Sequence, residues 1–188
     1  MTLIAKTARA LKYNFFGTNS TLILETLVMI LVVQNLGVYK YGQYVFVQTI
    51  FLFLEPIINL QIERALIRYL PDYRDESKDL VSAIIKFANR LKLSSFFITS
   101  LTVYFFWSYF FSDTLLFFYI ISLRNFFRIF WLNYSTVLQA FFEHKYKQSY
   151  SVLGSVIKLI MAFFFLPLYP TVETALLLTC INAIFLSI

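Results

Sequence analysis

The sequence is short of charged residues: Asp, Glu, Lys and Arg make up only 14% of its 188 positions, whereas they make up about a quarter of a soluble domain. Glycine and proline are scarce too, with four of each, and hydrophobic residues account for 60% of the chain. The mean hydropathy is +0.72. A domain of this size cannot bury so much apolar surface in a core. The composition therefore excludes a soluble globular fold and predicts an integral membrane protein.

Cysteine and histidine occur once each, as Cys180 and His144. A single cysteine excludes an intrachain disulfide and a cysteine-based metal site, and His144 has no second histidine with which to share a metal ion. We expect Cys180 to be a small packing residue and His144 to lie in a solvated polar loop. The sequence also has no glycine-rich phosphate loop and no plausible Ser/His/Asp set. We therefore expect no enzymatic activity, cofactor or metal ion.

The formal net charge of +6 raises the question of nucleic-acid binding, because basic patches displace counterions from phosphates. Here, however, the basic residues are spread between hydrophobic segments instead of forming one patch or stripe. We interpret them as loop charges that set the orientation of the chain in a membrane. The sequence thus predicts a lipid bilayer as the partner and no nucleic acid.

Six hydrophobic segments approach or exceed the roughly 20 residues that a helix needs to cross a bilayer. They are 15–36, 43–66, 91–111, 115–142, 150–168 and 171–188. The segments are long and do not alternate in polarity, which favours helices over barrel strands and predicts an all-α fold. We expect a polar turn at Gly37–Tyr44 between the first two segments, and Pro56 should kink the second helix. Residues 77–90 carry apolar side chains at helical spacing, and we favour an extension of the third span over a helix lying in the membrane interface.

The connections between these segments differ in basic charge. Three basic residues precede the first segment, seven lie between the second and third, and two lie between the fourth and fifth, while the other connections hold only Lys40. The positive-inside rule then predicts about six transmembrane helices with a cytoplasmic N-terminus. The last apolar run reaches Ile188 without a polar flank. We accordingly expect residues 1–188 to form a single membrane domain that is truncated in or just after the sixth span.

Several basic residues lie within the predicted spans, where charges are costly and usually face a cavity or a partner. Arg124 and Arg128 are one helical turn apart, and Gln139 falls within about 60° of them around the helix. Together with Lys158 in the fifth span, they are our candidate substrate-binding residues, because guanidinium groups hold phosphate through paired donors. The alternative is that the arginines form structural ion pairs or extend toward an interface.

Three carboxylates, Glu25, Glu55 and Glu63, lie in or at the end of the first two spans, and we expect Glu55 and Glu63 to share one face of the second helix. Glu55 precedes Pro56, and a proline kink there would free a backbone carbonyl, as in transporters with broken helices. Glu25 or Glu55 could carry a coupling proton or cation. Equally, these carboxylates could pair with Arg124, Arg128 or Lys158, and the sequence leaves both roles open.

Short motifs resemble a known family. They are Gly37-x-x-x-Tyr41-Gly42-x-Tyr44, then Ala65-Leu-Ile-Arg68-Tyr69-Leu-Pro-Asp-Tyr73, and later Leu138-Gln139-Ala140-Phe-Phe-Glu-His-Lys145. The pattern resembles the N-terminal portion of polysaccharide flippases. These are the O-antigen and lipid-linked oligosaccharide transporters of the multidrug/oligosaccharidyl-lipid/polysaccharide exporter superfamily. The chain departs from the family at Gln61, where members usually have glycine.

The resemblance implies a transporter of the bacterial cytoplasmic (inner) membrane. It implies that an undecaprenyl-pyrophosphate-linked glycan is flipped outward by alternating access, with the pyrophosphate or acidic sugars held by Arg124 and Arg128. Family members have twelve to fourteen spans in two lobes, so this chain would resemble the first lobe and need a missing C-terminal lobe or a partner membrane protein. Two alternatives are a non-transporting membrane subunit or scaffold and a multidrug antiporter of the same superfamily.

Overall fold

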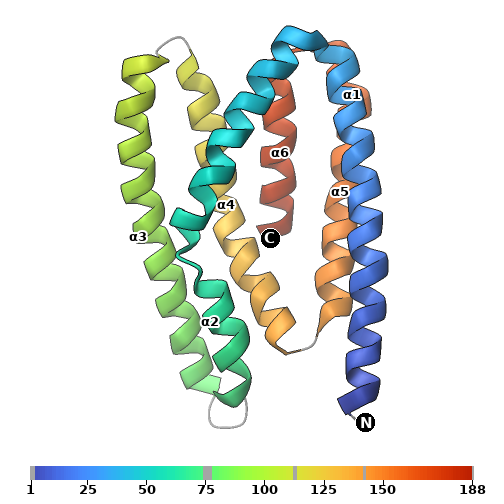
Figure 1. The fold of residues 1–188 in the computed structure, drawn as a ribbon, viewed down its shortest axis with the longest axis vertical. Helices are drawn as coiled ribbons and strands as arrows, with labels where there is room; N and C mark the ends of the chain where they lie inside the picture. The colour runs from blue at the N-terminus through green and yellow to red at the C-terminus, as the bar shows by residue number, and fades with distance from the viewer. Residues whose placement is uncertain (1–2, 74–77, 112–113, 142, 188) are drawn as a thin grey trace.

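The computed structural model describes residues 3–73, 78–111, 114–141 and 143–187, and these residues form helices with no strand among them. Figure 1 shows long helices that run alternately up and down. The elements are α1 (Leu3–Asn59), α2 (Ile62–Tyr69), the 3-10 helix η1 (Leu70–Tyr73), α3 (Lys78–Phe110), α4 (Leu115–Ala140), α5 (His144–Leu168) and α6 (Val172–Ser187).

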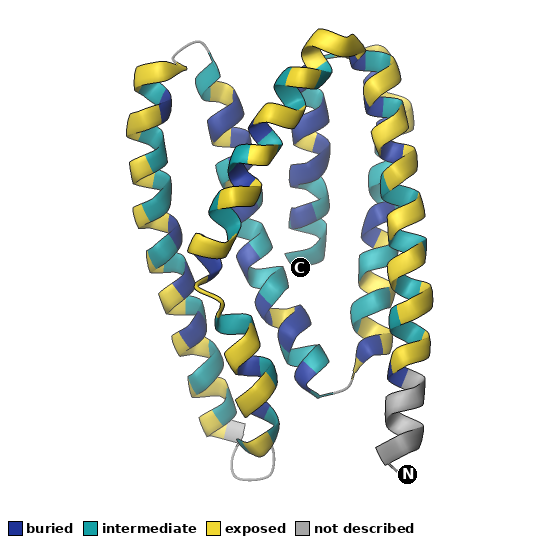
Figure 2. Ribbon diagram, in the orientation of Figure 1, coloured by how far each residue is buried: buried dark blue, intermediate teal, exposed yellow. Residues whose placement is uncertain are grey.

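Four helical stretches are long and apolar enough to cross a bilayer: Ala10–Asn59, Asp79–Phe110, Leu115–Ala140 and His144–Leu168. The apolar helix α6 is shorter, with 16 residues. Figure 2 shows exposed positions along the helices, and many of them carry large hydrophobic side chains. Such a surface is stable in lipid and not in water. The all-helical, multi-pass membrane fold expected from the composition is therefore confirmed at this level.

Helix α1 reverses direction at a single residue. Gly37 has φ 70° and ψ 172° and is the one non-helical position within α1, a conformation that glycine adopts without steric cost. It divides α1 into a first limb, residues 3–36, and a second limb, residues 38–59, which descend from a common apex in Figure 1. We expected a polar turn between the first two spans. Instead the residues after Gly37 are already helical.

The second limb ends in an unusual break. The helix continues past Pro56 to Asn59, and only then do Leu60 and Gln61 adopt positive φ values of 51° and 54°. Proline removes a backbone donor and weakens the last turn, and two consecutive left-handed residues other than glycine are uncommon. The predicted segment 43–66 is thus two helices. The break separates Glu55 from Glu63, which we expected on one continuous face.

Three further expectations concern α3, His144 and Cys180. Helix α3 is continuous from Lys78 to Phe110, so the amphipathic stretch extends the third predicted span as we favoured. His144 is the first residue of α5 and is buried, so the prediction of a solvated loop histidine is wrong. Cys180 is buried in the core and is a packing residue as expected.

Among the described residues the hydrophobic core has three parts, of which two meet at α6 and a smaller one joins the second limb, α3 and α4 around Ile129. The first contains Phe51, Trp107 and Phe118 and joins the second limb, α3 and α4 to α6. The second contains Val32 and Leu166 and joins the first limb and α5 to α6. Because α6 packs against both groups, the two limbs of α1 are held apart with their neighbours. The space between the limbs is lined by charged, polar and apolar residues.

Candidate functional site

A cavity of about 630 Å³ lies between the two limbs of α1, with further walls from α4, α5 and α6. Its size is within the range of small-molecule sites. The charged and amide residues that line it are Glu25, Gln48, Arg124, Arg128, Lys158 and Asn182. Hydroxyl groups, three aromatic side chains and several aliphatic ones complete the lining. Charged and polar groups thus share this interior with apolar ones, whereas large hydrophobic side chains are exposed on the outer surface.

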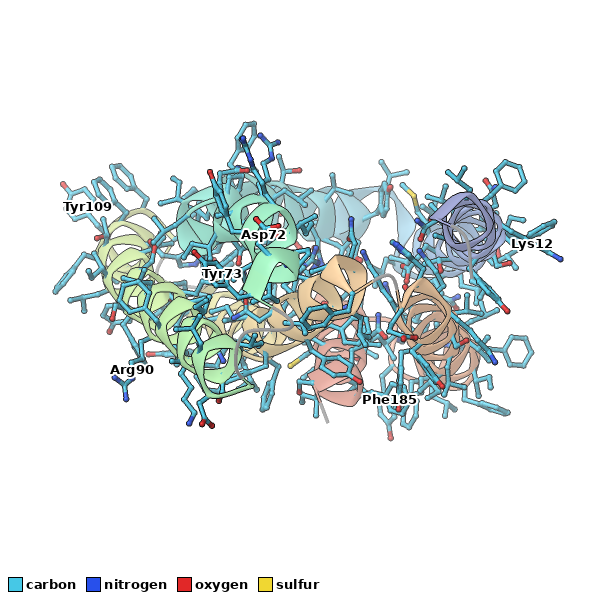
Figure 3. The ribbon with its side chains drawn as sticks, turned by 90° about the horizontal axis from the view of Figure 1, so that it is seen from below. Lys12, Asp72, Tyr73, Arg90, Tyr109 and Phe185 are labelled. Atoms are coloured by element: carbon cyan, nitrogen blue, oxygen red, sulfur yellow. The ribbon has the colours of Figure 1, made fainter. Side chains whose placement is uncertain are left out.

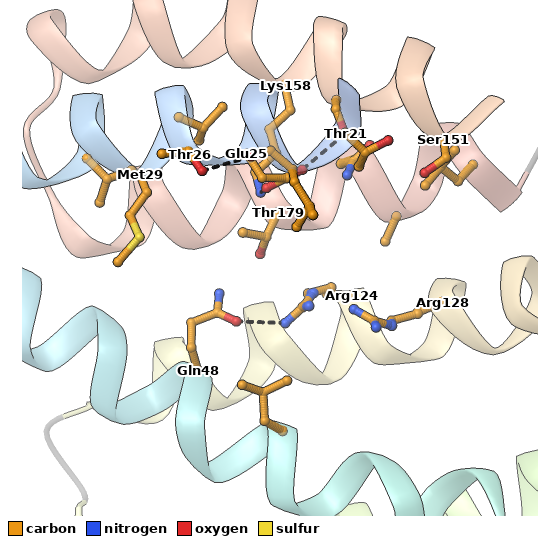
Figure 4. A pocket seen from close by; sticks show the side chains of 18 of the residues that line it. Thr21, Glu25, Thr26, Met29, Gln48, Arg124, Arg128, Ser151, Lys158 and Thr179 are labelled. Atoms are coloured by element: carbon orange, nitrogen blue, oxygen red, sulfur yellow. Dashed lines mark hydrogen bonds and ion pairs between the residues drawn. The ribbon is translucent and has the colours of Figure 1, made fainter. Parts of the chain in front are cut away.

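The cavity has two facing walls, shown in Figure 4. We name the first limb of α1 with α5 the first wall, and the second limb of α1 with α4 the second wall. Residues of α6, including Thr179 and Asn182, lie between them. Each wall contributes cationic side chains, but the partners of those cations differ.

In the first wall, both oxygens of the Glu25 carboxylate have partners on α5. Lys158 Nζ is 2.6 Å from Glu25 Oε2, and Ser155 Oγ donates to Glu25 Oε1 at 3.2 Å. The Lys158 side chain is 10% exposed, so its charge is largely removed from water and depends on Glu25. One cation and one carboxylate compensate each other there.

In the second wall, two arginines face one carboxylate. Arg128 Nη2 lies 2.8 Å from Glu55 Oε1, which forms an ion pair. Arg124 Nη1 donates to the side-chain oxygen of Gln48 at 2.9 Å. Among the described residues, Arg124 has no carboxylate within ion-pair distance. Its guanidinium group presents further donors and an uncompensated positive charge to the cavity.

The charges of the two walls together leave the cavity with one excess positive charge. An ion buried without a counter-ion is costly, which makes a bound anion the natural complement of Arg124. Two buried amides add polar capacity: Gln48 Nε2 and Asn182 Oδ1 have no hydrogen-bond partner within the described part of the chain. One is a donor and the other an acceptor. The lining therefore suits a ligand with an anionic group and neutral polar groups.

Comparison with known proteins does not extend this assignment. No protein-family model matches the chain, and no curated protein or solved structure matches it either. The proposed function consequently rests on the residues and on the geometry of the cavity.

The structure brings four of the seven candidate residues into this cavity: Arg124, Arg128, Lys158 and Glu25. Glu55 lies behind Arg128 and lines a small neighbouring cavity of about 10 Å³. The sequence left open whether the cations form structural ion pairs or face a cavity, and the structure contains both arrangements. Lys158 and Arg128 form ion pairs, whereas Arg124 is bound only by an amide.

The other two candidates lie outside the cavity. Gln139 accepts a hydrogen bond from Lys147 Nζ at 2.7 Å, so it ties α4 to α5 instead of facing the arginines. Glu63 pairs with Lys92 Nζ at 3.0 Å, and the Lys92 side chain is fully buried. That ion pair joins α2 to α3. Neither residue lines the space around Arg124, because Gln139 lies about 22 Å farther along α4 and the break after Asn59 separates Glu63 from the second limb.

Sequence reasoning missed Trp131 as a cavity residue, although its position could have been inferred. Trp131 is three residues after Arg128 and seven after Arg124, the spacing of one helical face. Asn182 and Thr179 had no such signal, because α6 has little asymmetry in its side chains. No His, Cys, Asp and Glu side chains gather into a metal-binding group of three among the residues that the structure describes.

Proposed function

We propose that this chain is the N-terminal, ligand-holding part of a flippase for lipid-linked oligosaccharides in the bacterial cytoplasmic membrane. The single observation that carries the proposal is Arg124: a cation inside a membrane bundle, facing a cavity, with an amide as its partner. A pyrophosphate group would supply the missing negative charge and accept several of the guanidinium donors. We expect Arg128 and Lys158 to contribute to the same anionic group.

The proposed topology has six membrane crossings with the N-terminus in the cytoplasm. Support comes from the alternating direction of the helices and from the distribution of basic residues. Exposed Lys12 and Arg90, which lie nearer the first ends of α1 and α3 than the last, point outward in Figure 3. The cation at the opposite end is Lys40, which donates to the carbonyl of Pro170 at 2.9 Å. An excess of basic residues at one end is what the positive-inside rule requires of the cytoplasmic side.

The backbone at Gln61 also supports the family resemblance. Family members usually have glycine near this point, and Gln61 has φ 54°, a left-handed conformation that favours glycine. The chain thus retains the backbone shape that a glycine would permit while carrying a different side chain. The proposal includes a second lobe for transport, which would come from a longer chain or from a partner membrane protein.

The ion pairs of the cavity indicate how an anionic ligand could be coupled to a proton or cation. A pyrophosphate that attracted Arg128 would leave Glu55 without its counter-ion. A pyrophosphate that attracted Lys158 would likewise leave Glu25 without its counter-ion. A carboxylate released in this way would favour uptake of a proton or a cation. We therefore retain Glu25 and Glu55 as candidate coupling groups and exclude Glu63, whose partner Lys92 lies outside the cavity.

The alternative functions fit the cavity less well. A multidrug antiporter for organic cations would need an available carboxylate, whereas Glu25 and Glu55 are each paired with a cation. A non-transporting scaffold would gain nothing from placing three cations around a cavity of about 630 Å³, because each charge costs free energy on insertion.

The proposal can be tested with farnesyl pyrophosphate, a short lipid pyrophosphate, and the purified chain in detergent. We expect R124Q to weaken binding roughly tenfold or more, because hydrogen bonds to a charged group are worth about 1.5–3 kcal/mol. The matched control is R90Q, which removes an exposed arginine far from the cavity. Equal affinity of R124Q and the unmodified chain would overturn the proposal.

A further inference from the structure

The face of α4 that carries the two arginines continues to an aromatic residue. Trp131 lines the same cavity as Arg124 and Arg128. Seven residues separate it from Arg124, which places the two about 10 Å apart along the helix. The indole is half-buried, so part of its surface is available inside the cavity. The cavity thus has a cationic part around Arg124 and a separate aromatic part.

Two tyrosines surround this indole. The Trp131 ring centroid lies 6.1 Å from that of Tyr134 and 6.3 Å from that of Tyr150, with interplanar angles of 45° and 60°. Tyr150 belongs to α5, so the second contact connects the two walls. Aromatic contacts of this kind restrict ring orientation. Trp131 is thereby held in place before any ligand arrives.

The first wall also carries neutral polar groups beside the Glu25–Lys158 ion pair. Thr21 on the first limb and Ser151 on α5 line the cavity, and Figure 4 shows them on the wall that faces Arg124 and Arg128. The Thr21 hydroxyl donates to the carbonyl of Gly17 at 2.9 Å and can accept from a ligand, whereas the Ser151 hydroxyl can donate or accept. A ligand between Trp131 and this wall would meet a flat apolar surface on one side and hydroxyl groups on the other.

Resting on the proposed function, we propose that Trp131 binds the first sugar ring of a ligand whose pyrophosphate lies on Arg124. A pyranose ring has an apolar C–H face, which packs on an indole, and a rim of hydroxyl groups, which suits Thr21 and Ser151. The separation of Trp131 from Arg124 is one that a pyrophosphate with one attached sugar can span. Trp131 is thus a specificity residue that distinguishes glycosylated from bare lipid pyrophosphates.

A lipid chain is a poorer occupant of this part of the cavity. An isoprenoid chain has no groups to satisfy the facing hydroxyls, which would lose hydrogen bonds to water on its binding. The apolar outer surface of the bundle already provides a better environment for such a chain. The polar lining near Trp131 therefore favours the sugar over the lipid.

The test compares two probes that differ only in the sugar: farnesyl pyrophosphate, and the same lipid pyrophosphate carrying one N-acetylglucosamine. Their affinities for the full chain are measured by calorimetry in detergent. We expect the sugar to increase the affinity roughly three- to tenfold, the range of a favourable aromatic contact. The variant W131L should lose this increase, measured as the ratio of its affinities for the two probes, whatever its affinity for the sugar-free probe. W131F should keep part of it.

A second readout uses the two tryptophans of the chain, Trp107 and Trp131. Trp107 is buried away from the cavity, where its Nε1 donates to Thr114. In the variant W107F, the remaining fluorescence reports on Trp131 alone. The glycosylated probe should shift or quench this emission more than the sugar-free probe does. Retained calorimetric binding by W107F shows that the variant is folded.

The outcomes separate the two proposals. If neither probe binds, or if R124Q leaves binding of the sugar-free probe intact, the proposed function fails and the role of Trp131 with it. If the sugar-free probe binds through Arg124 but the sugar adds no affinity, only the sugar site is overturned. The sugar site is likewise overturned if W131L and the unmodified chain gain equally from the sugar.

Discussion

The two walls of the cavity use intramembrane cations in different ways. In the first wall, Lys158 and Ser155 satisfy both oxygens of Glu25. In the second wall, Glu55 compensates Arg128 alone, and Arg124 has only the amide of Gln48. The first arrangement joins α1 to α5 through a compensated ion pair, whereas the second leaves one positive charge without a carboxylate. Our proposal that the second wall holds an anionic ligand rests on this difference in the number of counter-ions.

The largest expected effect comes from breaking the first wall. E25Q leaves Lys158 without its counter-ion, and we expect a loss of about 1–3 kcal/mol in the free energy of unfolding, less than for a fully buried pair because Glu25 is partly exposed. Denaturant unfolding in detergent measures this. The double variant E25Q/K158M should recover most of the stability, since it leaves no unpaired charge.

The same double variant tests whether the first wall is mainly structural. Its affinity for farnesyl pyrophosphate should fall much less than that of R124Q. A loss as large as that of R124Q would show that the two walls contribute equally to anion binding, and the contrast between them would be wrong.

A smaller effect, on the affinity for an anionic ligand, is expected from removing the counter-ion of Arg128. E55Q removes the carboxylate that holds Arg128 and should strengthen binding of farnesyl pyrophosphate by roughly three- to tenfold, because a second guanidinium becomes available to the anion. Raising the salt concentration should reduce the gain. Unchanged or weaker binding, measured by calorimetry, would mean that Arg128 needs Glu55 to be positioned for the ligand.

The smallest expected effect concerns the bend that joins the two walls. G37A introduces a Cβ at φ 70° and should cost about 1 kcal/mol of stability, because a residue with a side chain is strained there. The matched variant G42A lies in a helical stretch with no atom within 4 Å of the added Cβ. It should stabilise the chain by about 0.5–1 kcal/mol. Equal thermal shifts in both variants would argue against strain at the bend.

Helical spacing was enough to place several residues of the site. Arg124 and Arg128 share one face of α4 wherever that helix packs, and the same spacing extends to Trp131. The intramembrane location of Lys158 and Glu25 followed from hydropathy alone. Spacing failed where helices end. It put Glu55 and Glu63 on one face, but Leu60 and Gln61, which have left-handed backbone conformations, separate them. No local pattern in the sequence predicted that break.

No local pattern in the sequence could show which carboxylate pairs with which cation. Glu25 and Lys158 are 133 positions apart in the chain, and the sequence offered Arg124 and Arg128 as equally suitable partners for Glu25. Gln139 was placed near the arginines by its angle around the helix. Its contact with Lys147 depends instead on how α5 enters after the connection from α4.

The sequence by itself determined that the chain is helical and enters a membrane. Helices this long and this apolar would expose hydrophobic side chains to water if they lay outside a bilayer. The sequence also determined which cations lie within the apolar segments. Only the tertiary structure decided which of them are compensated. Electrostatic pairing acts over a few ångströms, and the packing of α4 and α5 against the two limbs of α1 sets those distances. That packing gives Lys158 a carboxylate and leaves Arg124 facing the cavity.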